Sequence, residues 1–144
     1  MKADFNTWKE GLFLCMLSGA LWGVVSLLLN TITGAFVLEA SVLHNLMTFA
    51  LGGALFGLVA GGILSVAQGL LPRWGLTPKA VAVSLLIWFA LNGAGILLSV
   101  MSPIRYHFDL GQSLQGLFLA VVLGLILGTF WKMGLKAGRG EAKA

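Results

Sequence analysis

The stretch Gly52-Gly53-Ala54-Leu55-Phe56-Gly57-Leu58-Val59-Ala60-Gly61-Gly62 repeats glycine at every fourth position within an uninterrupted apolar run. On a helix, residues four apart lie on the same face, so Gly53, Gly57 and Gly61 would form a ridge without side chains. In lipid, close backbone contact across small residues is one of the main forces that join helices, because burying leucine gains little over leaving it against lipid. We therefore predict that this ridge is the central packing surface of a membrane protein.

The composition around this stretch is that of a membrane protein. The 144 residues are 58% hydrophobic and 10% charged, whereas about 25% of the residues are charged in an average soluble domain. One span needs about 20 apolar residues, so a chain of this length has room for about four spans and short loops. We predict an all-α integral membrane protein, with four transmembrane helices in an antiparallel bundle, Gly-rich packing seams and both termini in the cytoplasm.

Four apolar runs give the predicted spans, which are residues 11–30, 46–71, 79–101 and 111–131. A polar N-terminus, residues 1–10, comes before them, and a basic tail, residues 132–144, follows them. Residues 35–45 are apolar but contain Glu39 and His44. We expect this segment at the membrane interface, either as a separate helix or as an extension of the second span with a bend near residues 44–48.

Short polar motifs predict where three of the helices begin. Thr7-Trp8-Lys9-Glu10 and Asp109-Leu110-Gly111-Gln112 match the capping box, in which the first side chain bonds the backbone three residues later and the fourth side chain bonds back. Thr77-Pro78 predicts a capping threonine followed by proline at the first helical position, where its missing N–H costs nothing.

Basic residues are unevenly distributed over the predicted loops. Eight of the nine Lys and Arg come before the first span, lie between the second and third spans, or follow the fourth span, and only Arg105 falls on the other side. The positive-inside rule then places both termini in the cytoplasm. Trp8, Trp74 and Trp131 fall on the same basic side, where an indole ring can be buried while its N–H stays hydrated. We expect the protein in a bacterial inner (cytoplasmic) membrane.

Several glycines are candidates for close helix packing. Residues 18–25 resemble residues 52–59, with glycines at matching offsets. This similarity predicts a shared packing mode; it could be the remnant of an inverted repeat, or a chance match in a sequence rich in Gly, Ala and Leu. The predicted packing positions are Gly19, Gly23, Gly53, Gly57, Gly61, Gly124 and Gly128.

Polar residues within the spans are candidates for a functional path. An unpaired amide in hydrocarbon costs several kcal/mol, so Asn92 is expected to face protein or water. Asn92 shares one helical face with Ser84, Trp88, Gly95 and Ser99. We predict that Asn92 bonds a neighbouring helix; a permeation or binding path that also uses Ser99 and Thr48, and an oligomer contact, are the alternatives.

A second polar group is expected at the non-cytoplasmic face. Its members are Glu39, His44, Arg105, His107 and Asp109. Imidazole and carboxylate groups could bind a metal such as Zn²⁺, but the spacing matches no strong metal motif. No serine has a sequence context that marks a nucleophile. We therefore predict no catalytic, metal or cofactor site.

The remaining composition limits the possible partners. The net charge of +4 comes from scattered basic residues without a basic, aromatic-interleaved segment, so we predict no binding of nucleic acid. The single Cys15 lies in the first apolar run and is expected to be a small core thiol. The expected partners are the lipid bilayer and either further copies of the chain or a larger membrane protein.

Three functions compete on this sequence. The first is a small non-catalytic multi-pass membrane protein that acts as a subunit or scaffold of a membrane assembly. The second is a small oligomeric transporter or channel with a polar path near Asn92. The third is a membrane enzyme at the outer face, for which no motif is recognisable. A water-lined cavity that reaches Asn92 would favour the second, and a sealed polar stripe would favour the first.

Overall fold

The computed structural model describes residues 5–67, 69–71, 74–102 and 109–141, and within these ranges all regular structure is helical. There are four helices: α1 (Phe5–Thr33), α2 (Val42–Ala67), α3 (Leu76–Met101) and α4 (Leu110–Glu141). Each contains a segment long and apolar enough to cross a membrane. At a rise of about 1.5 Å per residue, the 26 residues of α2 extend further than a hydrocarbon core of about 30 Å.

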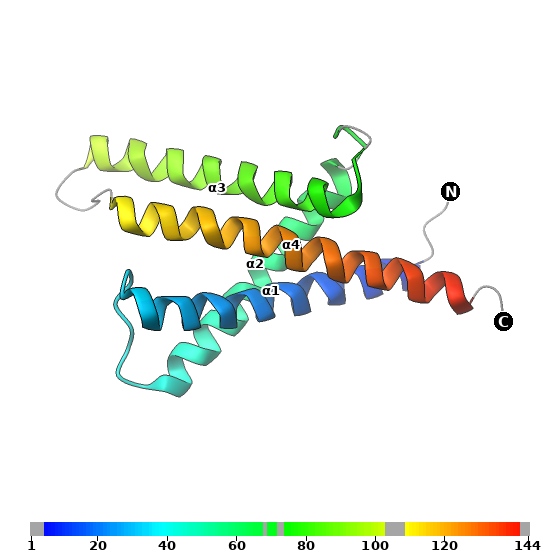
Figure 1. The fold of residues 1–144 in the computed structure, drawn as a ribbon, viewed down its shortest axis with the longest axis horizontal. Helices are drawn as coiled ribbons and strands as arrows, with labels where there is room; N and C mark the ends of the chain where they lie inside the picture. Colours follow the sequence, from blue (N-terminus) through cyan, green and yellow to red (C-terminus); the bar gives the residue numbers. More distant parts are fainter. Residues whose placement is uncertain (1–4, 68, 72–73, 103–108, 142–144) are drawn as a thin grey trace.

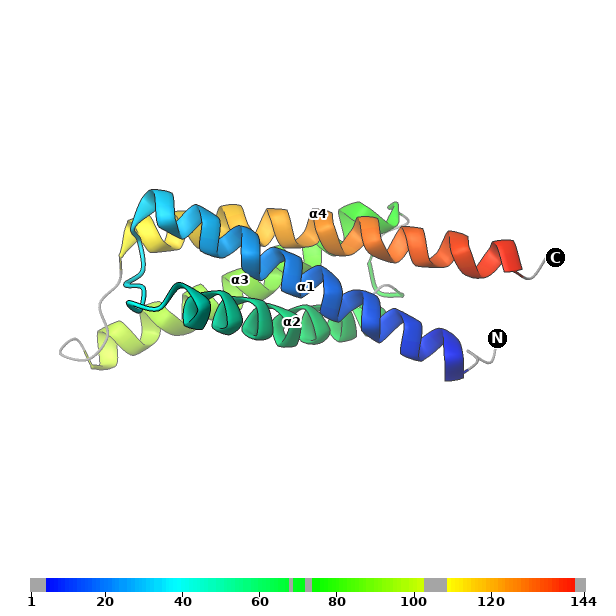
Figure 2. The same ribbon diagram turned by 90° about the horizontal axis from the view of Figure 1, so that it is seen from below.

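The helices form two close pairs. α1 packs against α2 and α3 packs against α4, and contacts between α1 and α4 join the pairs. α2 and α3 have few contacts with each other. Figures 1 and 2 show α2 crossing α1 obliquely, and the start of α1 and the end of α4 at the same end of the molecule.

The α1–α2 crossing is a backbone contact between glycines. A Cβ added at Gly57 would lie 2.6 Å from the Cα of Gly19, and one added at Gly53 would lie 2.9 Å from the Cα of Gly23. These glycines belong to the two similar stretches, residues 18–25 and 52–59, which therefore pack against each other. Gly61 continues the contact, because a Cβ there would overlap the Cys15 side chain.

The α3–α4 pair is also in close contact at glycines of α4, which here meet the backbone of residues other than glycine. A Cβ added at Gly124 would overlap the backbone of Val81, and one added at Gly128 would lie 2.7 Å from the Cα of Thr77. The buried hydrophobic core extends from this contact to the α1–α2 crossing. Its members are Cys15, Ala60, Leu64, Ala80, Val83, Leu123 and Leu127.

The starts of α1 and α3 differ from the sequence predictions. α1 begins at Phe5, before Thr7, so Thr7 is not its N-cap. The N-cap of α3 is Gly75 and has no side-chain bond, so the prediction of Thr77 as the cap is wrong. Pro78 is not at the first helical position, because α3 begins at Leu76. It still lies in the first turn, where a backbone N–H has no partner within the helix. Helix boundaries in a bilayer depend on membrane thickness and loop contacts as well as on local capping motifs.

Half of the predicted capping box at the start of α4 is confirmed. The backbone N–H of Gln112 donates to Oδ1 of Asp109 at 2.9 Å. The described residues show no reciprocal bond from the Asp109 N–H to the Gln112 side chain; the Gln112 side-chain amide donates to the Ala35 carbonyl at 2.8 Å. Gln112 thus connects α4 to the loop between α1 and α2.

That loop, residues 34–41, is held by two buried asparagines. The Asn30 amide donates to the Phe36 carbonyl at 2.9 Å and accepts from the Phe36 N–H at 2.8 Å. The Asn45 amide makes the same pair with the backbone of Glu39, at 2.8 and 3.0 Å. α2 starts at Val42 and is continuous through residues 44–48, so the end of the expected interfacial segment extends α2 and the rest is an irregular loop.

Candidate functional site

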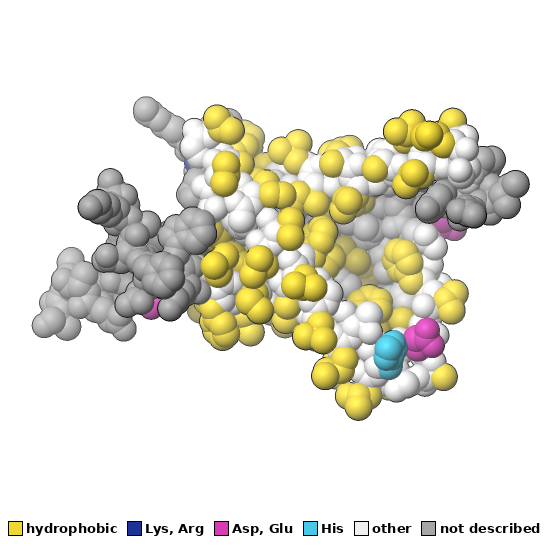
Figure 3. Space-filling view, turned by 180° about the vertical axis from the view of Figure 1, so that it is seen from behind, with side chains coloured by type: hydrophobic (Ala, Val, Ile, Leu, Met, Phe, Trp, Pro, Cys, Tyr) yellow, Lys and Arg dark blue, Asp and Glu magenta, His cyan; other side chains and the backbone are white. Residues whose placement is uncertain are grey.

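A cavity of about 430 Å³ lies among all four helices and is the main candidate site. It opens where α2 and α3 diverge, and Figure 3 shows this face hollowed between α3, at the top, and the beginning of α2, at the lower right. The volume lies within the range of about 300–1,000 Å³ that is typical of small-molecule sites. The cavity is therefore large enough for a ligand or for side chains of a partner.

Aromatic residues from three helices and the α1–α2 loop line the cavity. They are Trp22, Phe36, Phe49, Phe56 and Trp88. Trp22 and Phe56 stack with their ring centroids 5.3 Å apart and their planes at 19°. The Trp22 indole N–H donates to the Leu119 carbonyl at 2.7 Å, which fixes this ring against α4. One wall of the cavity is thus flat, aromatic and rigidly held.

Three hydroxyl side chains line the cavity in addition to the indole rings of Trp22 and Trp88, which each carry an N–H group. Ser26 donates to the Trp22 carbonyl at 2.8 Å, within its own helix. Thr48 is exposed at the opening. Ser84 is 2% exposed, and its Oγ has no hydrogen-bond partner. The cavity lining is therefore mainly apolar, and the Ser84 hydroxyl is shielded from it.

The predicted intramembrane polar residues do not form a common path. Asn92 is bonded to a neighbouring helix, as predicted: the Ser113 hydroxyl donates to Asn92 Oδ1 at 2.7 Å. Ser99 donates to the Ile96 carbonyl of its own helix at 2.7 Å. Neither Asn92 nor Ser99 lines the cavity, so Thr48 is the one of these three residues that does.

The predicted outer-face cluster is described only in part. Arg105 and His107 lie outside the described residues. Glu39 and His44 are exposed, and Asp109 caps α4. Within the described ranges, no three His, Cys, Asp or Glu side chains are placed so that they could hold a metal ion.

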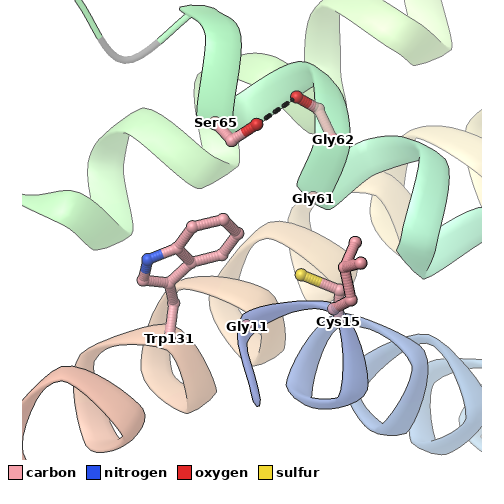
Figure 4. Close-up of a pocket in the computed structure, with 7 residues that line it drawn as sticks. Gly11, Cys15, Gly61, Gly62, Ser65 and Trp131 are labelled. Carbon is pink, nitrogen blue, oxygen red and sulfur yellow. Dashed lines mark hydrogen bonds between the residues drawn. The ribbon is translucent and has the colours of Figure 1, made fainter. Parts of the chain in front are cut away.

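A smaller pocket of about 100 Å³ lies at the other end of the α1–α2 contact. Figure 4 shows Trp131 of α4 on one side of it, Cys15 of α1 on another, and the Ser65 hydroxyl bonded to the Gly62 carbonyl at 2.7 Å. Cys15 is free and buried, as expected for a core thiol. Its side chain occupies the space that the missing Cβ of Gly61 leaves, so we interpret this region as helix packing.

Several residues that organise the site are not among the residues predicted from the sequence. Asn30 and Asn45 hold the loop that contributes Phe36, and the Trp22 indole joins α1 to α4. Each of these three residues has a polar side chain within or beside an apolar run, which is a sequence signal for a buried hydrogen bond. Their partners, however, are backbone groups that no sequence pattern identifies.

Comparison of the chain with known protein families, curated proteins and solved structures found no match.

Proposed function

We propose that the protein is a non-catalytic subunit or scaffold of a membrane assembly, and that α3 is the helix that meets its neighbour. The supporting observation is the poor coverage of α3. In the most apolar 18-residue segment of α3, 11% of the residues are buried, compared with 28% to 39% in the corresponding segments of the other three helices. Because α3 packs against the rest of the chain on one side, its opposite face is exposed along much of its length and can contact another transmembrane helix.

The exposed part of α3 is suited to close helix contact. Ala90, Gly93, Ala94 and Gly95 are exposed, and a Cβ added at Gly93 or Gly95 would meet no atom within 4 Å. At the glycines of the α1–α2 and α3–α4 contacts, by contrast, other atoms of the chain already occupy the space that a Cβ would take. Small residues let helix backbones approach in lipid, so the neighbour we propose is a transmembrane helix, either of a second copy or of a larger membrane protein.

The alternative of a transporter or channel has less support. The cavity lining is mainly apolar, and the polar group that was the best candidate for a path, Asn92, is already bonded to Ser113. A permeation path for a polar solute needs hydrogen-bonding groups along its length.

Substitution of Gly93 tests the proposed role of α3. In mild detergent, we expect the wild type to co-purify as a complex of constant composition and larger than one chain, and Gly93→Leu to yield the folded single chain. The matched control is Gly52→Leu on α2, because a Cβ at Gly52 also meets no atom within 4 Å; it should keep the complex. A wild type that is monomeric at every mild detergent condition would contradict the proposal.

We further propose that the four helices form an antiparallel bundle with both termini in the cytoplasm, because the basic residues gather on that side. In a Cys15→Ala background, a membrane-impermeant thiol reagent added outside intact cells should label Ala40→Cys and spare Gly75→Cys. Both positions are exposed, so access to the reagent depends on which side they face. Labelling in the reverse pattern would overturn the topology.

The substitution Asn92→Leu distinguishes the proposed scaffold role from the alternative transporter role. Interhelical hydrogen bonds in membranes contribute about 0.6 kcal/mol on average, so loss of the Ser113 bond should lower stability only slightly and leave partner recovery normal. The scaffold role predicts no solute flux in reconstituted vesicles for either form. Flux by the wild type that Asn92→Leu abolishes, at equal amounts of folded protein, would favour the transporter instead.

A further inference from the structure

The indole N–H of Trp88 is a hydrogen-bond donor without a partner. Trp88 is half-buried at the middle of α3, and none of the described residues accepts a hydrogen bond from its Nε1. The other indole in the cavity lining, that of Trp22, donates to the Leu119 carbonyl at 2.7 Å. Tryptophan N–H groups usually find a partner when they leave water. Trp88 can therefore bind a group that the described residues do not supply.

The free N–H belongs to the wall of the 430 Å³ cavity. Trp88 and Gly116 both line this cavity, and a Cβ added at Gly116 would lie 2.9 Å from Trp88 Nε1. Among the described residues, Ser84 Oγ is the one buried side-chain N or O atom without a partner, so the unpartnered Trp88 Nε1 keeps accessible surface. A molecule in the cavity can thus reach the Trp88 N–H, although it cannot reach the Ser84 hydroxyl.

The depth of Trp88 limits what can bind to its N–H. At a rise of about 1.5 Å per residue, about 18 Å of helix separates Trp88 from either end of α3. In a hydrocarbon core about 30 Å thick, the N–H then lies near the midplane, away from water and lipid headgroups. A trapped water would need two to four polar partners, which the mainly apolar lining does not offer. The backbone carbonyls of a neighbouring transmembrane helix are already bonded within that helix.

The entrance of the cavity faces the same apolar surroundings. It lies between α2 and α3, which have few contacts with each other, and Figure 3 shows this face hollowed. In a bilayer this side borders hydrocarbon, so a lipid-soluble molecule can enter sideways without crossing water.

We propose that the cavity binds a neutral, lipid-soluble molecule that carries a carbonyl oxygen, and that this oxygen accepts the hydrogen bond of the Trp88 N–H. A carbonyl accepts without donating, whereas a hydroxyl would bring a donor that needs its own acceptor. An acyl chain would leave the N–H unpaired, and the ester carbonyls of bilayer lipids lie outside the hydrocarbon core. The binding site is independent of the proposed scaffold role, because it uses the inner cavity and not the exposed small residues of α3.

The test compares benzophenone, a neutral lipid-soluble ketone, with diphenylmethane, which has a CH₂ group in place of the carbonyl. Equilibrium dialysis of the purified full chain in detergent, corrected for uptake by protein-free micelles, should show saturable binding of one benzophenone per chain. Trp88→Phe keeps an aromatic ring but removes the N–H. It should weaken benzophenone binding about tenfold, the effect of one net hydrogen bond, and leave diphenylmethane binding unchanged.

Two further variants serve as controls. Trp74→Phe removes the N–H of an exposed indole outside the cavity, and it should bind benzophenone as the wild type does. Gly52→Trp adds a large side chain at an open position on the cavity wall, and it should abolish binding of both probes. Unchanged diphenylmethane binding by Trp88→Phe shows in the same experiment that this variant is folded and that its cavity is intact.

Three results would overturn the proposal. The first is the absence of saturable benzophenone binding to the wild type. The second is a Trp88→Phe variant that binds benzophenone as tightly as the wild type, or that loses both probes equally, because the N–H would then select no carbonyl. The third is benzophenone binding that persists in Gly52→Trp, because the probe would then occupy another site.

Discussion

Gly57→Leu is expected to prevent folding of the α1–α2 pair. A Cβ at this position would overlap the Cys15 carbonyl and lie 2.6 and 2.8 Å from the Cα and N of Gly19. These are backbone atoms, so no rotamer change can make room, and α1 and α2 would have to separate along the whole crossing. Overpacking against movable side chains typically costs about 1–3 kcal/mol; here the loss should exceed that range. Size-exclusion chromatography in detergent should show aggregated protein or very little protein.

Gly52→Leu is the matched control for this experiment. Gly52 belongs to the same helix and the same apolar run, but a Cβ there meets no atom within 4 Å. Both substitutions remove one glycine and add the same side chain, so helix propensity and hydrophobicity change equally. Gly52→Leu should elute as the wild type does. Equal behaviour of the two variants would show that the α1–α2 crossing does not depend on glycine contact.

The four helices could be predicted from the sequence because a span is a local property. About 20 apolar residues in a row are enough to identify one, and the structure has four such helices. The glycine positions could also be selected from their four-residue spacing. The residues that these glycines contact could not be predicted, because the spacing within one helix does not indicate which other helix packs against it. The contacts of Gly53 with Gly23 and of Gly124 with Val81 required the three-dimensional arrangement.

The candidate site was predicted less well, and for a physical reason. The bond from Asn92 to a neighbouring helix follows from the cost of an unpaired amide in lipid, and Ser113 provides it. The cavity depends on the divergence of α2 from α3, which is a property of helix crossing angles and leaves no trace in composition. The sequence predicts Ser84 on the polar face of its helix, but only the structure shows that its buried hydroxyl has no hydrogen-bond partner.

Asn30→Leu is expected to release the loop between α1 and α2. The Asn30 side chain is 1% exposed and satisfies both the N–H and the carbonyl of Phe36. Leucine has a similar size and can bond neither group. Each backbone group left unpaired in a buried site costs about 1–3 kcal/mol, so the loop should detach from Asn30 and hydrate instead. Protease digestion in detergent should then cut within residues 34–41, and the unfolding midpoint should fall.

Thr31→Leu provides the control, because Thr31 is adjacent, exposed and bonded only to the Leu28 carbonyl of its own helix. It should leave the loop as resistant to protease as in the wild type. The effect of Asn30→Leu should also reach the cavity, since Phe36 lines it and the same loop is bonded to α4 through Ala35 and Gln112. Unchanged protease resistance in Asn30→Leu would mean that Asn45 and Gln112 alone hold the loop. In that case the double variant of Asn30→Leu and Asn45→Leu should release it, because Asn45 makes the same pair of bonds to Glu39.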